Sequence, residues 1–306
     1  MRRSRTGWIT TIVAMSVVIL SAFAYGQSKL AEVPNNLPDT QRDALTKQKA
    51  ALLEERNILK SRIDIHNKKL VPKNSPEERE LHREAEHLKS EIQKHEAASR
   101  KFNQTVEFVQ TLQSPNSRGT PVRVPLTNDV DNRSAYHYFK VIEQFEVESS
   151  PRYEPGTKTY CNIFAWDVTR AMGAEIPHWV IIGDKSGASA VDIDGKFKVE
   201  AKKREELKVN QTVSWLKNHG KTNGWRRVDA RMAQQMANDG HPTIAVWENP
   251  DPESSGHITV VRPGSIGDDR GVAIAQSGRL VLDARHIKTG FNDPDLEKPI
   301  QYWYHE

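Results

Sequence analysis

Apolar residues recur at helical spacing over the first third of the chain. Between Leu81 and Val109 the steps alternate between three and four residues, a heptad pattern with polar interruptions. This seam consists of Leu81, Ala85, Leu88, Ile92, His95, Ser99, Phe102, Val106 and Val109. A less regular seam precedes it and consists of Leu45, Leu52, Leu59, Ile63 and Leu70. The pattern predicts two long helices within residues 39–113.

The junction between these helices carries helix-start signals. The segment VPKNSPEE holds Pro72 and Pro76, the only prolines between residues 39 and 113. Ser75 fits the N-cap, Pro76 fits the first helical position, and Glu78 completes a Ser-x-x-Glu capping box. A turn this short forces the two helices to run antiparallel, so we expect a coiled-coil hairpin.

Charge favours pairing of the two helices with each other. Residues 39–73 hold nine basic and five acidic side chains, whereas residues 74–113 hold six basic and eight acidic ones. Each surface pair contributes only ~0.2–1 kcal/mol. We expect a solvated spacer that pairs internally; a regulatory or partner-binding role is the alternative.

The hydrophobic pattern of the remaining chain is that of a globular domain. Helix-like segments begin near Thr159, Gln211 and Asp229, and the last ends at Gly240. Strand-like runs follow at Thr243–Trp247, His257–Arg262, Val272–Gln276, Leu280–Asp283 and Ile300–His305. A helix first, with strands clustered afterwards, predicts an α+β fold.

The first 26 residues have the composition of an export signal. Arg2, Arg3 and Arg5 precede an uncharged apolar run, and Ala22-Phe23-Ala24 provides a site for cleavage near Ala24 or Gly26. Membrane anchoring through residues 8–24 is the alternative, because the run is long for a cleaved signal. Either way the body of the protein is predicted to be exported.

Net charge gives little support to nucleic-acid binding. The chain has a formal charge of +4, but three of the positive charges belong to the signal, which leaves the body near +1. Hydrophobic content of 37% and charged content of 27% favour a soluble body over a polytopic membrane protein. We therefore expect no nucleic-acid partner.

A single cysteine carries the candidate chemistry. One cysteine cannot form an internal disulfide, and a lone thiol in an oxidising compartment is a liability unless it is buried or used. Cys161 opens the amphipathic segment TYCNIFAWDVTRAMG, and Thr159 is a plausible N-cap. In the first turn of a helix the unpaired N–H groups and the dipole favour a thiolate, which is the useful nucleophile. A buried structural cysteine is the other interpretation.

His257 is the candidate base. It begins the buried run GHITVVRPG, so a strand would fix its backbone while its ring stays within reach of a thiol on a facing helix. If the strand of VAIAQSG lies beside it, the amide oxygen of Gln276 could accept the imidazole N–H. His286 is a second histidine of interest. No metal-ligand spacing surrounds His257, and we expect no metal and no cofactor.

These motifs resemble a known family. TYCNIFAWDVTRAMG, GHITVVRPG and IAQSG are similar to the papain-like NlpC and CHAP peptidoglycan hydrolases, over roughly residues 130–295. The resemblance implies a helix bearing the Cys packed on an antiparallel sheet bearing the His. It assigns Cys161 as nucleophile, His257 as base and Gln276 as the orienting group. The third position departs from the pattern, since the family commonly has His, Glu or Asn there.

The resemblance also suggests supporting residues and a substrate. A Tyr upstream of the Cys is common near the oxyanion; Tyr153 and Tyr160 are candidates, with Tyr153 favoured. Asn162 and Asp167 lie near the nucleophile in the sequence, where roles in catalysis, helix capping and packing are all open. The implied activity is hydrolysis of an amide or peptide bond through a thioester, most naturally in peptidoglycan, in a bacterial periplasm, envelope or extracellular space.

Two other functions fit the same residues. Acyl transfer would use the same thioester with an amine as acceptor, and a non-catalytic scaffold would bind wall peptides without cutting them. Several tryptophans could line a groove or belong to the core: Trp166, Trp179, Trp215, Trp225 and Trp247. The expected organisation is a signal or anchor at 1–26, a linker at 27–38, the hairpin at 39–113, a linker at 114–129 and the catalytic domain at 130–306.

Overall fold

The computed structural model describes residues 29–69, 71–72, 74–128, 130–190, 201–267, 270–291 and 299–306. The expected export segment, residues 1–26, lies outside these ranges. Among the residues that are described, no helix combines the length and apolarity needed to cross a membrane. The chain divides into two compact units between Glu107 and Phe108.

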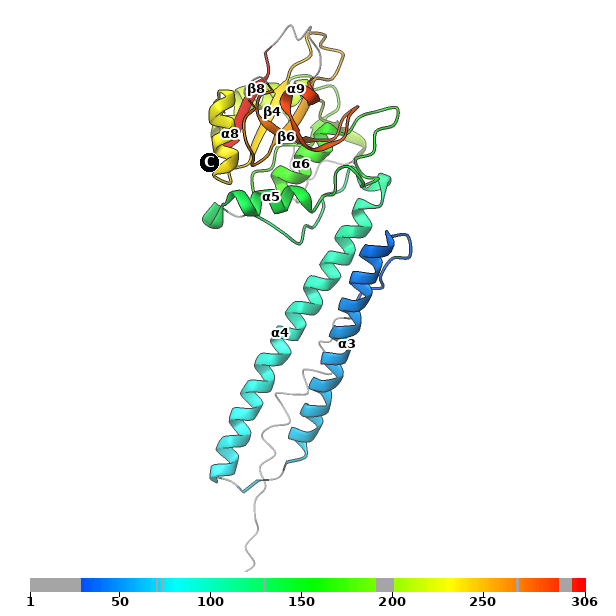
Figure 1. The fold of residues 1–306 in the computed structure, drawn as a ribbon, viewed down its shortest axis with the longest axis vertical. Coiled ribbons are helices and arrows are strands. Elements are labelled where there is room, and N and C mark those ends of the chain that lie inside the picture. Colours follow the sequence, from blue (N-terminus) through cyan, green and yellow to red (C-terminus); the bar gives the residue numbers. More distant parts are fainter. Residues whose placement is uncertain are drawn as a thin grey trace, which may run out of the picture. The chain divides into compact units, whose positions relative to one another are not determined.

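The first unit contains two long helices, as the seam pattern predicts (Figure 1). Helix α3 spans Asp39–Asn67, and helix α4 spans Pro76–Leu112, of which the residues from Phe108 onward belong to the second unit. The predicted seam is largely buried: Leu45, Leu52, Leu59, Ile63, Leu81, Ala85, Leu88, His95, Ser99, Phe102 and Val106. Ile92 and Val109 are only half-buried, and Leu70 lies outside the described residues.

Ion pairs show the relative direction of the two helices in the first unit. Arg62 of α3 pairs with Glu91 at 2.8 Å, whereas Lys69, which follows the end of α3, pairs with Glu84, earlier on α4, at 2.5 Å. The helices are therefore antiparallel and pair with each other. The Glu78 N–H donates to Ser75 Oγ at 3.1 Å, as the capping box predicts. The Glu78 carboxylate accepts from the N–H of Asn74, one residue before the expected partner.

The second unit is a mixed α+β structure built on antiparallel sheets, which confirms the coarse fold prediction (Figure 1). Within the described residues the main sheet has the strand order β3-β8-β4-β5-β6-β7, and β1 and β2 form a separate pair. The strands of the main sheet are β3 Trp225–Val228, β4 Thr243–Trp247, β5 His257–Val261, β6 Ala273–Gln276, β7 Leu282–His286 and β8 Gln301–His305. The small pair consists of β1 Trp179–Ile181 and β2 Arg204–Glu206.

The helices of this unit are α5 Ala135–Glu143, α6 Cys161–Ala171, α7 Val209–Trp215, α8 Ala230–Asn238 and α9 Ile287–Gly290. Short 3-10 turns lie at Pro115–Ser117, Val130–Asn132, Ala201–Lys203 and Lys221–Asn223, and a π-helical turn at Leu216–Gly220 follows α7. The predicted cap of α8 is confirmed, because the Asp229 side chain accepts from the N–H of Met232. The sequence pattern missed α5, α9, β1, β2 and β3, and began β7 two residues too early.

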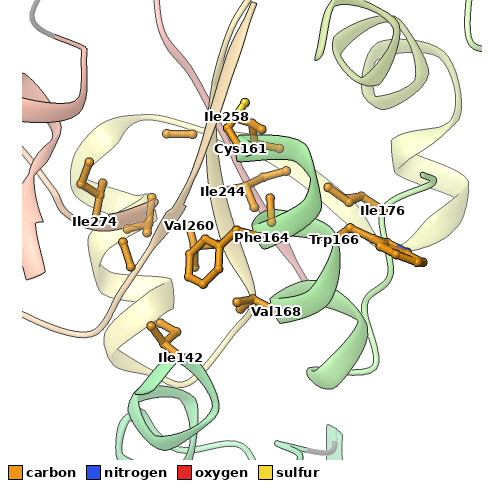
Figure 2. Close-up of a cluster of buried hydrophobic side chains, with 14 of the residues drawn as sticks. Ile142, Cys161, Phe164, Trp166, Val168, Ile176, Ile244, Ile258, Val260 and Ile274 are labelled. Carbon is orange, nitrogen blue, oxygen red and sulfur yellow. The ribbon is translucent and has the colours of Figure 1, made fainter. Parts of the chain in front are cut away.

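The central strands β4, β5 and β6 are buried on both faces, so their sequences are continuous apolar runs without alternation. Helix α6 packs against β5 and is buried at nearly every position. Figure 2 shows its apolar side chains, among them Phe164 and Val168, beside Ile244, Ile258 and Val260 of the sheet. A helix that is buried on nearly every side has its place inside a core.

Tyr138 of α5 joins the strands that carry the core. Its buried hydroxyl donates to the carbonyl of Val261 at 2.8 Å and accepts from the N–H of Thr243 at 3.1 Å. Thr243 begins β4 and Val261 ends β5, so one phenol fixes the helix against both strands. Both main-chain groups therefore have a hydrogen-bond partner although they are buried.

Tyr138→Phe is expected to lower the free energy of unfolding by about 1–3 kcal/mol, because the N–H of Thr243 and the carbonyl of Val261 lose a buried partner. Tyr136→Phe, on the exposed side of the same helix, is the matched control and should change the stability little. Tryptophan fluorescence during urea unfolding measures this unit selectively, since every tryptophan except Trp8 lies after residue 160. Equal stability of the two variants would contradict the assignment.

Candidate active site

Cys161 is the first residue of α6, so it lies in the first helical turn as predicted. The N-cap is Tyr160 and not Thr159, and the Tyr160 side chain makes no capping hydrogen bond. No side chain at the N-cap therefore competes for the N–H groups of this turn. The thiol is 5% exposed and interacts with the backbone N–H groups of Asn162 and Ile258. Figure 2 shows Cys161 at the start of the helix, beside Ile258 of β5.

His257 is the first residue of β5, the strand that packs against α6. Its ring acts on the Cys161 sulfur both as a hydrogen-bond partner and as a charge. The structure thus brings together two residues that are 96 positions apart in the sequence. A helix start and a strand start meet at one edge of the core, where each backbone is fixed by secondary structure.

Gln276 is the last residue of β6, which pairs antiparallel with β5, so the expected adjacency of the two strands is confirmed. His257 Nε2 lies 2.9 Å from Gln276 Oε1. The amide orientation is set from the other side, because Gln276 Nε2 donates to the carbonyl of Leu280 at 3.1 Å. With Nε2 donating to Gln276, Nδ1 is the nitrogen left to exchange a proton with the thiol.

Opposing effects act on the Cys161 pKa. Burial raises it and is the largest single cause, but the hydrogen bond and charge of His257 and the N–H groups of Ile258 and Asn162 lower it. The net pKa of Cys161 lies below its ordinary value. For His257, burial lowers the pKa, whereas Cys161 and then Gln276 raise it, and the net shift is upward. Both shifts favour a thiolate–imidazolium pair.

Tyr153 does not lie at the nucleophile. Its buried hydroxyl donates to Asp167 Oδ2 at 2.7 Å, and Arg152 binds the same carboxylate through Nε at 2.7 Å and through a second nitrogen at 2.9 Å. Asp167 lies six residues after Cys161, about 9 Å along the helix axis and on another face. The structure therefore places Tyr153 and Asp167 in a buried polar cluster beneath the site.

Arg152 extends this cluster into the preceding loops. Its guanidinium is fully buried and donates to the carbonyl and hydroxyl of Ser117 and to the carbonyl of Thr120. Burial and the nearby Asp167 together raise the pKa of Tyr153, so its hydroxyl stays protonated and remains a donor. The Tyr153 carbonyl accepts from Ser277 Oγ at 2.8 Å, which links the cluster to the residue after Gln276.

The remaining predicted residues have mixed placements. Asn162 contributes its backbone N–H to the sulfur, whereas its side chain donates to Glu206 Oε1 at 2.5 Å and so attaches β2 beside the site. The Tyr160 ring packs under the guanidinium of Arg118, 3.6 Å from ring centroid to Cζ. His286 ends β7, two strands away from β5 in the sheet. The structure does not bring it to Cys161.

Most of the tryptophans belong to the core. Trp166, Trp215 and Trp225 are buried. Trp179 and Trp247 are half-buried, and Trp247 lies opposite His257 in the β4–β5 ladder.

Three neighbours of the His257–Gln276 pair were not predicted from the sequence. The ring of Phe291 packs edge-on against the His257 imidazole with 4.8 Å between centroids. Gly290 approaches the Gln276 amide, and Gly278 approaches the His257 ring. The segments QSGR and IKTGF contain these glycines, but nothing in their spacing indicates that they meet the site.

Across the described ranges, no group of three or more His, Cys, Asp or Glu side chains is arranged to hold a metal ion. Comparison with protein-family models finds no match. Comparison with curated proteins likewise finds none. The fold and site define a mixed α+β protein with three side-chain groups in a row: a buried thiol on a helix, an imidazole on a strand and an amide on the adjacent strand.

The rate at which iodoacetamide alkylates Cys161 should stay high at pH values where an ordinary thiol is protonated and unreactive. The reason is that the net pKa of this thiol is lowered. His257→Ala should raise the midpoint, since the hydrogen bond and charge of His257, which lower the pKa of Cys161, are lost while burial still raises it. The pH dependence of the alkylation rate measures both, and the single cysteine removes any background. A midpoint unmoved by His257→Ala would show that the two groups are uncoupled.

Asp167→Ala should lower the free energy of unfolding by about 3–5 kcal/mol, because Arg152 would remain buried without its carboxylate. Tyr153→Phe removes only one hydrogen bond to a charged group and should cost about 1.5–3 kcal/mol. Urea unfolding followed by tryptophan fluorescence checks both values. If Tyr153→Phe abolished reactivity of the thiol while stability stayed unchanged, the hydroxyl would have a direct role at the nucleophile.

Proposed function

We propose that this chain is an exported, papain-like cysteine hydrolase that cleaves an amide bond, with peptidoglycan as the favoured substrate. The observation that carries the proposal is the chain of contacts from the Cys161 thiol through the His257 ring to the Gln276 amide. A buried structural cysteine needs neither a charged neighbour nor an orienting amide. The likeness of three sequence motifs to NlpC and CHAP hydrolases supports the substrate class, and the predicted signal supports export.

In the first half of the reaction the Cys161 thiolate attacks the carbonyl carbon and forms a C–S bond. The negative charge moves to the carbonyl oxygen, where first-turn N–H groups of α6 can stabilise it. The His257 imidazolium then gives its Nδ1 proton to the amide nitrogen, the C–N bond breaks and the amine leaves. What remains is a thioester on Cys161 and a neutral imidazole.

The second half returns the enzyme to its starting state. Neutral His257 accepts a proton from water, the resulting hydroxide attacks the thioester carbonyl, and the C–S bond breaks to release a carboxylic acid. The thiolate–imidazolium pair forms again. Throughout both halves Gln276 holds the imidazole through Nε2, so that Nδ1 faces the reacting atoms.

The decisive test is digestion of purified peptidoglycan by the chain without residues 1–26, with released fragments identified by mass. Wild-type protein should release peptide or amine fragments, and Cys161→Ala should release none, because the thioester can no longer form. Cys161→Ser is the matched control for side-chain shape and should be at least 10²-fold slower, since an alcohol at this position has no lowered pKa.

Two outcomes would redirect the proposal. Cleavage by Cys161→Ala equal to that of the wild type would exclude a thioester route. A new amide between the acyl fragment and an added amine, formed only by the wild type, would identify an acyltransferase that uses the same pair.

A further inference from the structure

The last residue of α9 lies directly against the group that orients the candidate base. A Cβ atom added to Gly290 would overlap Gln276 Oε1, and it would stand 3.0 Å from Gln276 Cδ and 2.6 Å from Ile274 Cδ1. The Gln276 Oε1 atom is the same atom that accepts from His257 Nε2. Helix α9 packs on β6 and β7, which is how its main chain comes so near (Figure 1).

Backbone conformation does not explain the glycine at this position. The described glycines with positive φ are Gly173, Gly183, Gly187, Gly224, Gly240 and Gly271, and Gly290 is not among them. An alanine could adopt its φ without strain. The requirement for glycine therefore comes from the close approach of Gln276 and Ile274.

The Gln276 amide is thus confined on two sides. The main chain at Gly290 lies beside the oxygen, and the Leu280 carbonyl accepts from the amide nitrogen. The next residue, Phe291, packs its ring against the His257 imidazole, whose Nε2 donates to this oxygen. One short segment, Gly290–Phe291, thereby contacts both members of the His257–Gln276 pair.

We propose that Gly290 is a positioning residue: its bare Cα fixes the direction of the Gln276 amide and, through it, the orientation of the His257 ring. The inference rests on the proposed function for its consequence in catalysis, but the geometric part concerns only the His257–Gln276 contact. A methyl group at position 290 would push the amide oxygen away from Nε2. His257 would then lose a contact that raises its pKa.

The first experiment uses the full chain and measures the titration midpoint of His257 by NMR of labelled histidine, with the resonance assigned from a His257→Gln variant. Gly290→Ala and Gln276→Ala should both lower the midpoint of His257. Gly156→Ala is the matched control, because an added Cβ there meets nothing within 4 Å. It should leave the midpoint unchanged.

The second experiment is a double-mutant cycle with hydrolysis as the readout. Gly290→Ala alone should reduce kcat/KM by roughly 10²-fold, the order expected for a misplacement near 1 Å, with the alkaline limb of the pH profile moved to lower pH. In the Gln276→Ala background it should change kcat/KM by less than about 2-fold, because the contact it disturbs is already gone. An equal loss in both backgrounds would overturn the proposal.

A third variant separates the two overlaps. Gly290→Ala combined with Ile274→Val removes the Cδ1 atom and leaves only the overlap with the amide, so it should retain the lowered His257 midpoint. If Gly290→Ala fails to fold but folds when Gln276→Ala is added, the crowding is confirmed by that rescue. Failure of both to fold would show that Gly290 serves the fold and not the amide, which overturns the inference.

These readouts distinguish the inference from the proposed function. A wild-type chain that hydrolyses no peptidoglycan, yet shows a His257 midpoint lowered by Gly290→Ala, would remove the function and keep the positioning role. A wild-type chain that hydrolyses peptidoglycan but has a His257 midpoint insensitive to Gly290→Ala would do the reverse.

Discussion

The second unit depends on one constraint: α6 runs through the core with almost no exposed side, and its first residue must still meet the first residue of β5. A helix surrounded by apolar side chains cannot rotate or slide without opening cavities, each of which costs several kcal/mol. Its start is therefore fixed as firmly as its middle. This rigidity places the Cys161 sulfur against the His257 ring without any dedicated tether between the two residues.

The same burial creates a problem that the surrounding loops solve. Asp167 lies in the middle of α6 and is 2% exposed, so its carboxylate needs partners within the core. Arg152 supplies two hydrogen bonds, Tyr153 supplies a third, and the remaining donors of Arg152 reach Ser117 and Thr120. A buried charge of this kind rarely adds net stability, but it specifies which loop lies where. Here it attaches the loop that holds Ser117 and Thr120 to α6.

The sequence predicts the features that depend on neighbouring residues along the chain better than those that depend on tertiary contacts. The hairpin seam and the strands β4, β5 and β8 follow from local periodicity and apolar runs, so the pattern finds them. Strand β3, with the sequence WRRV, escapes because two arginines break the apolar run of this edge strand. Cys161 and His257 can be recognised from the sequence because each is a reactive residue type at the start of a predictable helix or strand. Tyr153 is not, since its hydroxyl partner is chosen by a tertiary contact with Asp167.

Two of the positions that sequence reasoning misses, Gly278 and Gly290, are ones where a side chain is absent. Gly256 precedes His257, and a Cβ there would overlap the Trp247 carbonyl; Gly278 would place one 3.1 Å from His257 Cε1. Gly278 and Gly290 let main chain approach His257 and Gln276 more closely than a side chain would permit. A hydrogen-bonded pair is oriented as much by such excluded volume as by its own bond, because the 2.9 Å contact restrains distance more tightly than direction. Around the imidazole and its amide partner, two glycine backbones and one aromatic ring therefore restrict the directions that the hydrogen bond leaves open.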